Sequence, residues 1–112
     1  MRYKNFKKKG MFLDEIRKIK SELMDSGLRK VILFGSRARG DNGPASDWDL
    51  LILTDTKQTF SIDFDKYAMP FVLCGIDFNE SVGTHVYSID EWETYRGNSL
   101  FYHNVTNEGI EL

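Results

Sequence analysis

Two short apolar runs rich in branched residues, at residues 31–34 and 50–53, constrain the fold of this chain most. Each run is short and lies next to turn-forming residues, so each predicts a strand that is buried on both faces. Residues 40–46, between the runs, contain Asp, Asn, Gly and Pro and predict a loop. Because this loop can fold back on itself, we expect the first strand and a second strand over residues 47–54 to be neighbours in one sheet.

The rest of the chain predicts a helical cover and further strands. Apolar residues recur with helical spacing over residues 11–26, and Ser88 with Glu91 fits an N-terminal capping box for a short helix. The other expected elements are a helical segment over 58–69 closed by Pro70, a hairpin of strands over 71–78 and 82–88, and a last helix over 99–108. Together they predict an α/β (α+β) fold with a small mixed sheet of about four strands and helices packed on it.

Length and composition limit the classes of protein that this chain can belong to. Its 112 residues fit one domain, which we expect over residues 11–112, after a flexible basic tail over residues 1–10. The net charge of −2 gives no overall basic field, so a nucleic-acid partner stays an open question. Cys74 has no second cysteine to pair with, and His85 and His103 lack metal-ligand spacing, so we interpret all three as structural or surface residues. No apolar run suits a signal peptide or a membrane span, and we expect a cytoplasmic protein with no membrane partner.

Gly35 and Ser36 form the first motif with chemical meaning. They stand where a buried strand turns into a helical stretch, and N–H groups at the start of a helix attract anions. Glycine lets a phosphate approach the main chain, and the serine hydroxyl adds a contact. Arg37 and Arg39 follow, and the sequence leaves open whether each contacts a nucleotide or is a surface charge.

Asp47 and Asp49 form the second motif. Residues two apart in a strand point to the same face, so the two carboxylates share one face while Trp48 points to the core. Two adjacent carboxylates repel each other, and a divalent cation removes that conflict. Magnesium prefers oxygen ligands and commonly binds one or two carboxylates together with substrate phosphates. The two motifs together predict a site for a nucleoside triphosphate on Mg²⁺.

Gly35-Ser36, Gly40 and the Ser-Asp-Trp-Asp-Leu segment at residues 46–50 resemble the signature of the DNA polymerase β-type nucleotidyltransferase superfamily. More closely, the chain resembles the minimal nucleotidyltransferases, small proteins often encoded beside a helical HEPN-domain protein. The resemblance implies a palm-like nucleotidyltransferase fold. It also implies that Gly35 and Ser36 bind the phosphates of a nucleotide, and Arg37 and Arg39 remain the further candidates for nucleotide binding.

The family uses a third carboxylate on a later strand, beside the first two. The resemblance implies that Asp77 supplies it, with Glu80 as the second choice, and that Asp47, Asp49 and Asp77 are the catalytic and metal-binding residues of a site with two Mg²⁺ ions. Because the positions around Gly75 depart from the family pattern, the identity of this third carboxylate stays open.

The activity that the resemblance implies is magnesium-dependent transfer of a nucleoside monophosphate, AMP from ATP, to an unidentified acceptor hydroxyl. The protein would then be the antitoxin half of a pair with a HEPN-domain toxin. The alternative is a non-catalytic module that binds a nucleotide or the toxin. A homodimer is a further expectation, because the domain is small for enclosing a nucleotide by itself.

Overall fold

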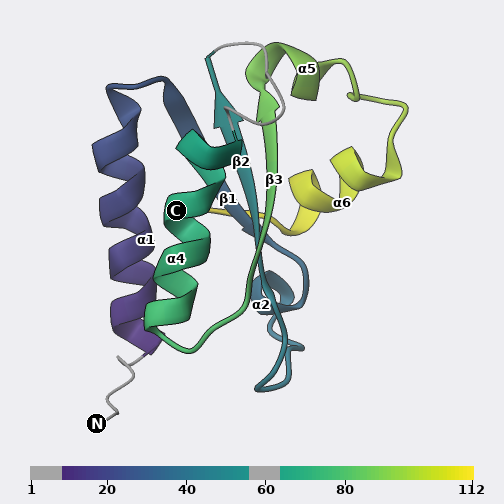
Figure 1. Ribbon diagram of the computed structural model, residues 1–112. Helices are drawn as coiled ribbons and strands as arrows, with labels where there is room; N and C mark the ends of the chain where they lie inside the picture. Colours follow the sequence, from purple (N-terminus) through teal and green to yellow (C-terminus); the bar gives the residue numbers. More distant parts are fainter. Residues whose placement is uncertain (1–8, 56–63) are drawn as a thin grey trace, which may run out of the picture.

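The computed structural model describes residues 9–55 and 64–112 (Figure 1). The helices are α1 (Lys9–Met24), α2 (Ser36–Arg39), the π-helix η1 (Phe64–Ala68), α4 (Met69–Asp77), α5 (Ile89–Glu93) and α6 (Leu100–Glu108). The strands are β1 (Leu28–Phe34), β2 (Trp48–Thr54), β3 (Val82–Ser88) and β4 (Ile110–Glu111). None of the described helices is long and apolar enough to cross a membrane. Residues 1–8 of the expected tail and 58–63 of the expected helical segment lie outside the described residues.

The four strands form one mixed sheet in the order β3-β2-β1-β4. Strand β1 is antiparallel to both β2 and β4, whereas β2 and β3 are parallel. In this register Phe34 of β1 is paired with Asp49 of β2, and Asp49 is paired with Gly83 of β3. The predicted mixed sheet is therefore confirmed, as is the adjacency of the strands on either side of the 40–46 loop.

Helices cover both faces of the central strand β2 (Figure 1). Trp48 and Leu50 point to one face and pack with residues of α1 and α4. Leu51 and Leu53 point to the other face and pack with residues of α5 and α6. Burial on both faces explains why the interior of this strand shows no polar alternation. Asp49, on the face of Leu51, is the one residue of β2 that is not fully buried.

The strand predicted over residues 71–78 is wrong, because this segment forms α4 and its C-terminal cap. Pro70 begins the helix rather than ending an earlier one: in the first turn its missing N–H costs no hydrogen bond and its fixed φ suits a helix. The predicted hairpin is therefore also wrong, and β3 pairs with β2 instead. The buried positions of the segment have helical spacing: Phe71, Cys74, Gly75 and Phe78.

Local signals at the other helices are confirmed. The amphipathic helix begins two residues before the predicted start and ends at Met24. Ser88 Oγ accepts a hydrogen bond from the Glu91 N–H at 3.0 Å, and Glu91 Oε1 accepts one from the Ser88 N–H at 3.1 Å, as a capping box requires. Strand β4 has no counterpart among the predicted elements; its two residues pair with Ile32 and Leu33, near the C-terminal end of β1.

Gly75→Ala is expected to lower the free energy of unfolding by about 1–3 kcal/mol, the usual cost of overpacking. A Cβ at this position would lie 2.7 Å from both the Glu80 carbonyl oxygen and Val82 Cγ2, where α4 meets the start of β3. Gly43→Ala is the matched control, because a Cβ there would meet nothing nearer than Ser46 Oγ at 4.0 Å. Urea denaturation compares the two variants, and equal midpoints would contradict this close packing.

Candidate functional site

The end of β1 and the start of β2 bring the Gly35 turn against Asp49. Gly35 has a φ of 77°, a left-handed value that favours glycine. A Cβ on Gly35 would also collide with Asp49 Oδ2, so glycine is required here both for its backbone conformation and for the close approach. Ser36 begins the one-turn helix α2, which Gly40 caps with a φ of 86°. The structure thus brings together the two motifs that the sequence places on opposite sides of a loop.

Asp49 is a carboxylate in an unfavourable place for a charge. Its partial burial raises the pKa above the ordinary value for aspartate, and the neighbouring charge of Asp47 raises it further. The charges of His85 and Arg39 act in the opposite direction. Asp47 is exposed at the start of the strand, so the pair forms the open end of an otherwise buried strand.

Arg39 lies at the rim of this site between two carboxylates. Its guanidinium contacts Asp41 Oδ2 at 3.1 Å and Glu108 Oε2 at 3.0 Å. These hydrogen bonds raise the pKa of Arg39 above its already high ordinary value, so the side chain stays charged. Glu108, at the end of α6, also accepts a hydrogen bond from the Gly35 N–H at 2.6 Å. Glu108 is absent from the predicted site, and no local sequence signal points to it.

Arg37 does not lie at the carboxylate pair. Its side chain is 4% exposed and stacks on the ring of Trp48, with 4.5 Å between the guanidinium carbon and the ring centroid. It donates hydrogen bonds to the carbonyl oxygens of Ser46 and Pro44 and lies 3.7 Å from Glu80. The Arg37 side chain therefore holds the loop before Asp47 in place from the face of the sheet that carries Trp48, opposite to the face of Asp49.

The expectation that Asp77 lies on a strand beside the first two carboxylates is wrong. Asp77 is the exposed last residue of α4, and this helix packs on the face of β2 that carries Trp48, not Asp49. Glu80, the second choice, accepts a hydrogen bond from Trp48 Nε1 at 2.9 Å and pairs with Arg37. Neither carboxylate shares the face of Asp49.

Strand β3, which follows α4 in the sequence and pairs with β2 at Asp49, contains no carboxylate. Gly83 of β3 is paired with Asp49, and a Cβ on it would lie 3.1 Å from Asp49 Oδ1. His85, two residues further on the same face, is exposed and has its ring 5.5 Å from those of both Phe34 and Phe101. On β3, the position paired with Asp49 is therefore a glycine, and the next residue on the same face is His85, which contacts Phe34 and Phe101.

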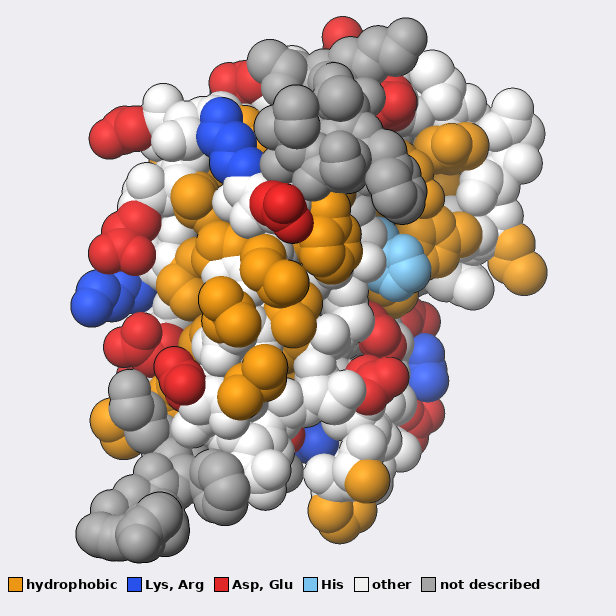
Figure 2. Space-filling model, viewed as in Figure 1, with side chains coloured by type: hydrophobic (Ala, Val, Ile, Leu, Met, Phe, Trp, Pro, Cys, Tyr) orange, Lys and Arg blue, Asp and Glu red, His pale blue; other side chains and the backbone are white. Residues whose placement is uncertain are grey.

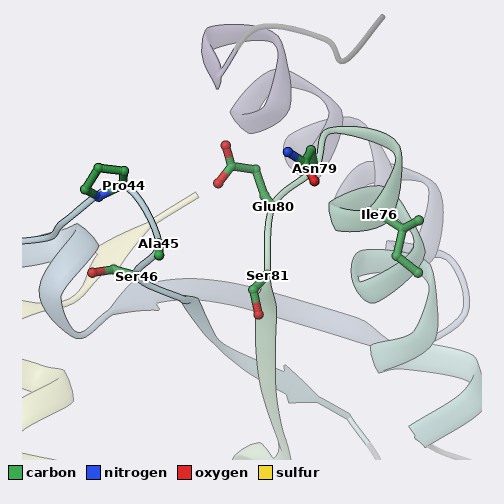
Figure 3. A pocket seen from close by; sticks show the side chains of 7 residues that line it. All are labelled: Pro44, Ala45, Ser46, Ile76, Asn79, Glu80 and Ser81. Atoms are coloured by element: carbon green, nitrogen blue, oxygen red, sulfur yellow. The ribbon is translucent and has the colours of Figure 1, made fainter. Parts of the chain in front are cut away.

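A shallow hollow of about 440 Å³ opens on the other side of the 40–46 loop (Figure 3). It is lined by residues 44–46, residues 79–81 and Ile76. Glu80, whose side chain is drawn in Figure 3, lines this hollow and also contacts Arg37 and Trp48. None of Gly35, Ser36, Asp47 or Asp49 lines it, so it is separate from the carboxylate site.

Residues 13–93 match the family model of the nucleotidyltransferase domain. The chain belongs to the nucleotidyltransferase domain family, which is a family of enzymes. The matched segment contains the Gly35 turn and both aspartates, whereas Glu108 lies beyond its end. No curated protein matches the chain.

Two solved structures share the fold of this nucleotidyltransferase domain. One is a crystal structure of a toxin–antitoxin with AMP-PNP, at 19% identity and a TM-score of 0.55, covering 85% of this chain and 69% of that chain. The other is a crystal structure of a mutant of the toxin–antitoxin MntA-HpeT, at 18% identity and a TM-score of 0.56, covering 87% of this chain and 70% of that chain. At such low identity the likeness shows the fold alone.

The donor set at Asp47 and Asp49 fits a hard cation. Repulsion within the pair is among the causes that raise the pKa of Asp49, and a divalent cation would remove this repulsion. Within residues 9–55 and 64–112 no group of three or more His, Cys, Asp or Glu side chains is arranged for a metal. The protein therefore offers two carboxylates, and phosphate and water oxygens would complete the coordination of Mg²⁺.

Arg37→Ala is expected to lower the free energy of unfolding by about 3 kcal/mol, because it leaves the Glu80 carboxylate, which is only 10% exposed, without its cation and exposes one face of Trp48. Arg17→Ala, which removes an exposed pair with Asp14, is the matched control and should change it by less than about 0.5 kcal/mol. Chemical denaturation measures both. A loss no greater than that of the control would contradict a structural role for Arg37.

Asp49 predicts a pH dependence of the metal-free protein. Its pKa is higher in the folded than in the unfolded chain, so between about pH 4 and the raised pKa only the folded state holds the proton. Stability is therefore expected to fall as pH rises through this window. In Asp49→Asn this loss should vanish and the melting temperature at pH 7 should rise. Melting curves recorded in chelator from pH 4 to 8 test this, and identical pH dependence in both proteins would refute it.

Proposed function

We propose that this chain is a magnesium-dependent nucleotidyltransferase that transfers a nucleoside monophosphate, AMP from ATP, to a hydroxyl group. The observation that carries the proposal is the packing of the Gly35 turn against Asp49, because a glycine turn beside two carboxylates suits a phosphate chain on a cation. The family match supports the reaction class. The choice of ATP rests on the resemblance to minimal nucleotidyltransferases and on the AMP-PNP in one structural neighbour.

In this proposal Asp47 and Asp49 would hold one Mg²⁺, while the hydroxyl and the N–H group of Ser36 would bind the terminal phosphates. When bound, the ion neutralises the triphosphate and stabilises charge on the leaving group. Arg39 adds a positive charge at the rim. Asp77 cannot hold the second ion expected from the resemblance, because it lies on the opposite side of the sheet.

The chemical step is an in-line displacement that needs no covalent intermediate on the protein. The acceptor oxygen forms a bond to the α-phosphorus, and the bond from that phosphorus to the bridging oxygen breaks. Pyrophosphate leaves with the electron pair, and the hydroxyl proton passes to solvent. The residues of the chain contribute by orienting the triphosphate and by fixed charges that do not have to reorganise.

We further propose that the acceptor hydroxyl belongs to a partner protein, a HEPN-domain toxin, which this chain binds as its antitoxin. The structural neighbours are components of toxin–antitoxin structures. Helix α4 exposes an apolar surface that includes Leu73 and Ile76, at 53% and 65% exposure. Figure 2 shows hydrophobic side chains gathered over the face formed by α1 and α4. Such a surface suits a protein partner, and a second copy of this chain is the competing occupant.

A binding module without turnover is the second candidate. The observation that favours it is the lack of any carboxylate on β3, the strand next to Asp49. In that case the chain would take up a nucleotide and hold a partner without transferring the nucleotidyl group.

The two candidates predict different results with ATP that carries label on the α-phosphate. In the presence of Mg²⁺ and a HEPN-domain partner protein, the enzyme is expected to move label onto that partner, and Asp49→Asn should reduce the rate by at least about 100-fold because the metal loses a ligand. Asp14→Asn, which changes an exposed carboxylate on α1, is the matched control and should transfer label at the original rate. Calorimetric uptake of Mg²⁺ and AMP-PNP without any transfer would favour the binding module, and no uptake by well-folded protein would refute both.

A further inference from the structure

Glu108 connects the C-terminal part of the chain to the Gly35 turn. It is the last residue of α6, lies outside the segment that matches the family model, and has a side chain that is 19% exposed. Its carboxylate makes two kinds of contact at the site. Oε2 accepts a hydrogen bond from the Gly35 N–H, and both oxygens accept hydrogen bonds from Arg39 Nη1.

The sheet explains why the Gly35 N–H needs this partner. On the outer edge of β1, β4 pairs with Ile32 and Leu33, and the Leu112 N–H donates to the Val31 carbonyl oxygen at 2.8 Å. Strand β4 begins at Ile110, so its backbone does not extend to Gly35. The Glu108 side chain takes the place of the missing strand, and the 2.6 Å distance is that of a charge-assisted hydrogen bond.

The same carboxylate sets the position of Arg39. Nη1 lies 3.2 Å from Oε1 and 3.0 Å from Oε2 of Glu108, while the Nε of Arg39 contacts Asp41. The guanidinium is therefore held from two sides at the rim, where its charge lowers the pKa of Asp49. One side chain, Glu108, therefore contacts both the Gly35 turn and the cation next to it.

We infer that Glu108 is a positioning residue for the phosphates of the nucleotide, which it never contacts itself; this inference rests on the proposed function. By holding the Gly35 turn and Arg39 in place before the nucleotide arrives, it reduces the ordering that binding must achieve. Its own negative charge opposes a triphosphate. Removal of a carboxylate that acted only through its charge would therefore tighten nucleotide binding, whereas removal of a positioning residue weakens it.

The test compares Glu108→Ala and Glu108→Gln with the wild type by calorimetry of AMP-PNP binding in Mg²⁺. Glu108→Ala is expected to raise the Kd by about tenfold, the effect of losing a hydrogen-bonded charged group. Glu108→Gln keeps an oxygen acceptor for Gly35 and should fall between the two. In label transfer, KM for ATP should rise with Kd while kcat stays within about threefold. Glu111→Gln, which changes an exposed carboxylate of β4 that lies 3.9 Å from Lys30, is the matched control and should leave all three quantities unchanged.

Two further measurements separate this role from the alternatives. The Glu108 charge acts on Asp49, so Mn²⁺ affinity without nucleotide should change slightly in both variants, but much less than nucleotide affinity in Glu108→Ala. An equal loss of Mn²⁺ and nucleotide affinity would overturn the inference in favour of a metal ligand. Hydrogen exchange at the Gly35 amide should become faster in Glu108→Ala. A wild type that does not take up AMP-PNP would refute the proposed function and this inference with it. Nucleotide affinity in Glu108→Ala equal to or tighter than in the wild type would overturn the inference alone.

Discussion

The candidate site depends on the carboxylate of Asp49, the one partly exposed residue of β2, a strand that is otherwise buried on both faces. Helices α1 and α4 cover one face of β2 and α5 and α6 cover the other, but near Asp49 the second cover stops. The glycine turn fills part of this opening, since only a residue without a Cβ leaves room for Asp49 Oδ2. The fold thus keeps a charge in a half-buried place that an apolar side chain would fill more favourably, which is typical of functional sites.

Patterns within one element were sufficient to predict much of the fold. The apolar runs at β1 and β2, the capping box at Ser88 and the helical spacing of α1 are confirmed. The error at α4 has a local cause, because a proline can end one helix or begin the next, and the residues after Pro70 satisfy both apolar strand and apolar helix patterns. The error at Asp77 followed from it: once the segment is a helix on the face of Trp48, its last carboxylate cannot reach Asp49.

Contacts between distant segments account for the part of the site that the sequence does not reveal. Arg37 and Arg39 are equivalent in the sequence, yet residues two apart on a single helical turn point in nearly opposite directions. One guanidinium therefore stacks on Trp48 while the other lies near Asp49. The packing of α6 and the pairing of β4 with β1 bring Glu108 to Gly35, and a strand of two residues has too little pattern to predict.

Because a chain is synthesised from its N-terminus, β4 becomes available for pairing after β1, β2 and β3. A nascent chain that has exposed every residue up to 107 already holds the glycine turn and both aspartates, and the three long strands can pair. Its Gly35 amide still lacks the acceptor that comes from Glu108, and the outer edge of β1 lacks the Ile110–Glu111 strand. On the ribosome the three long strands could therefore pair before the Gly35 turn acquires its carboxylate partner, which becomes available only after residues 108–111 have emerged.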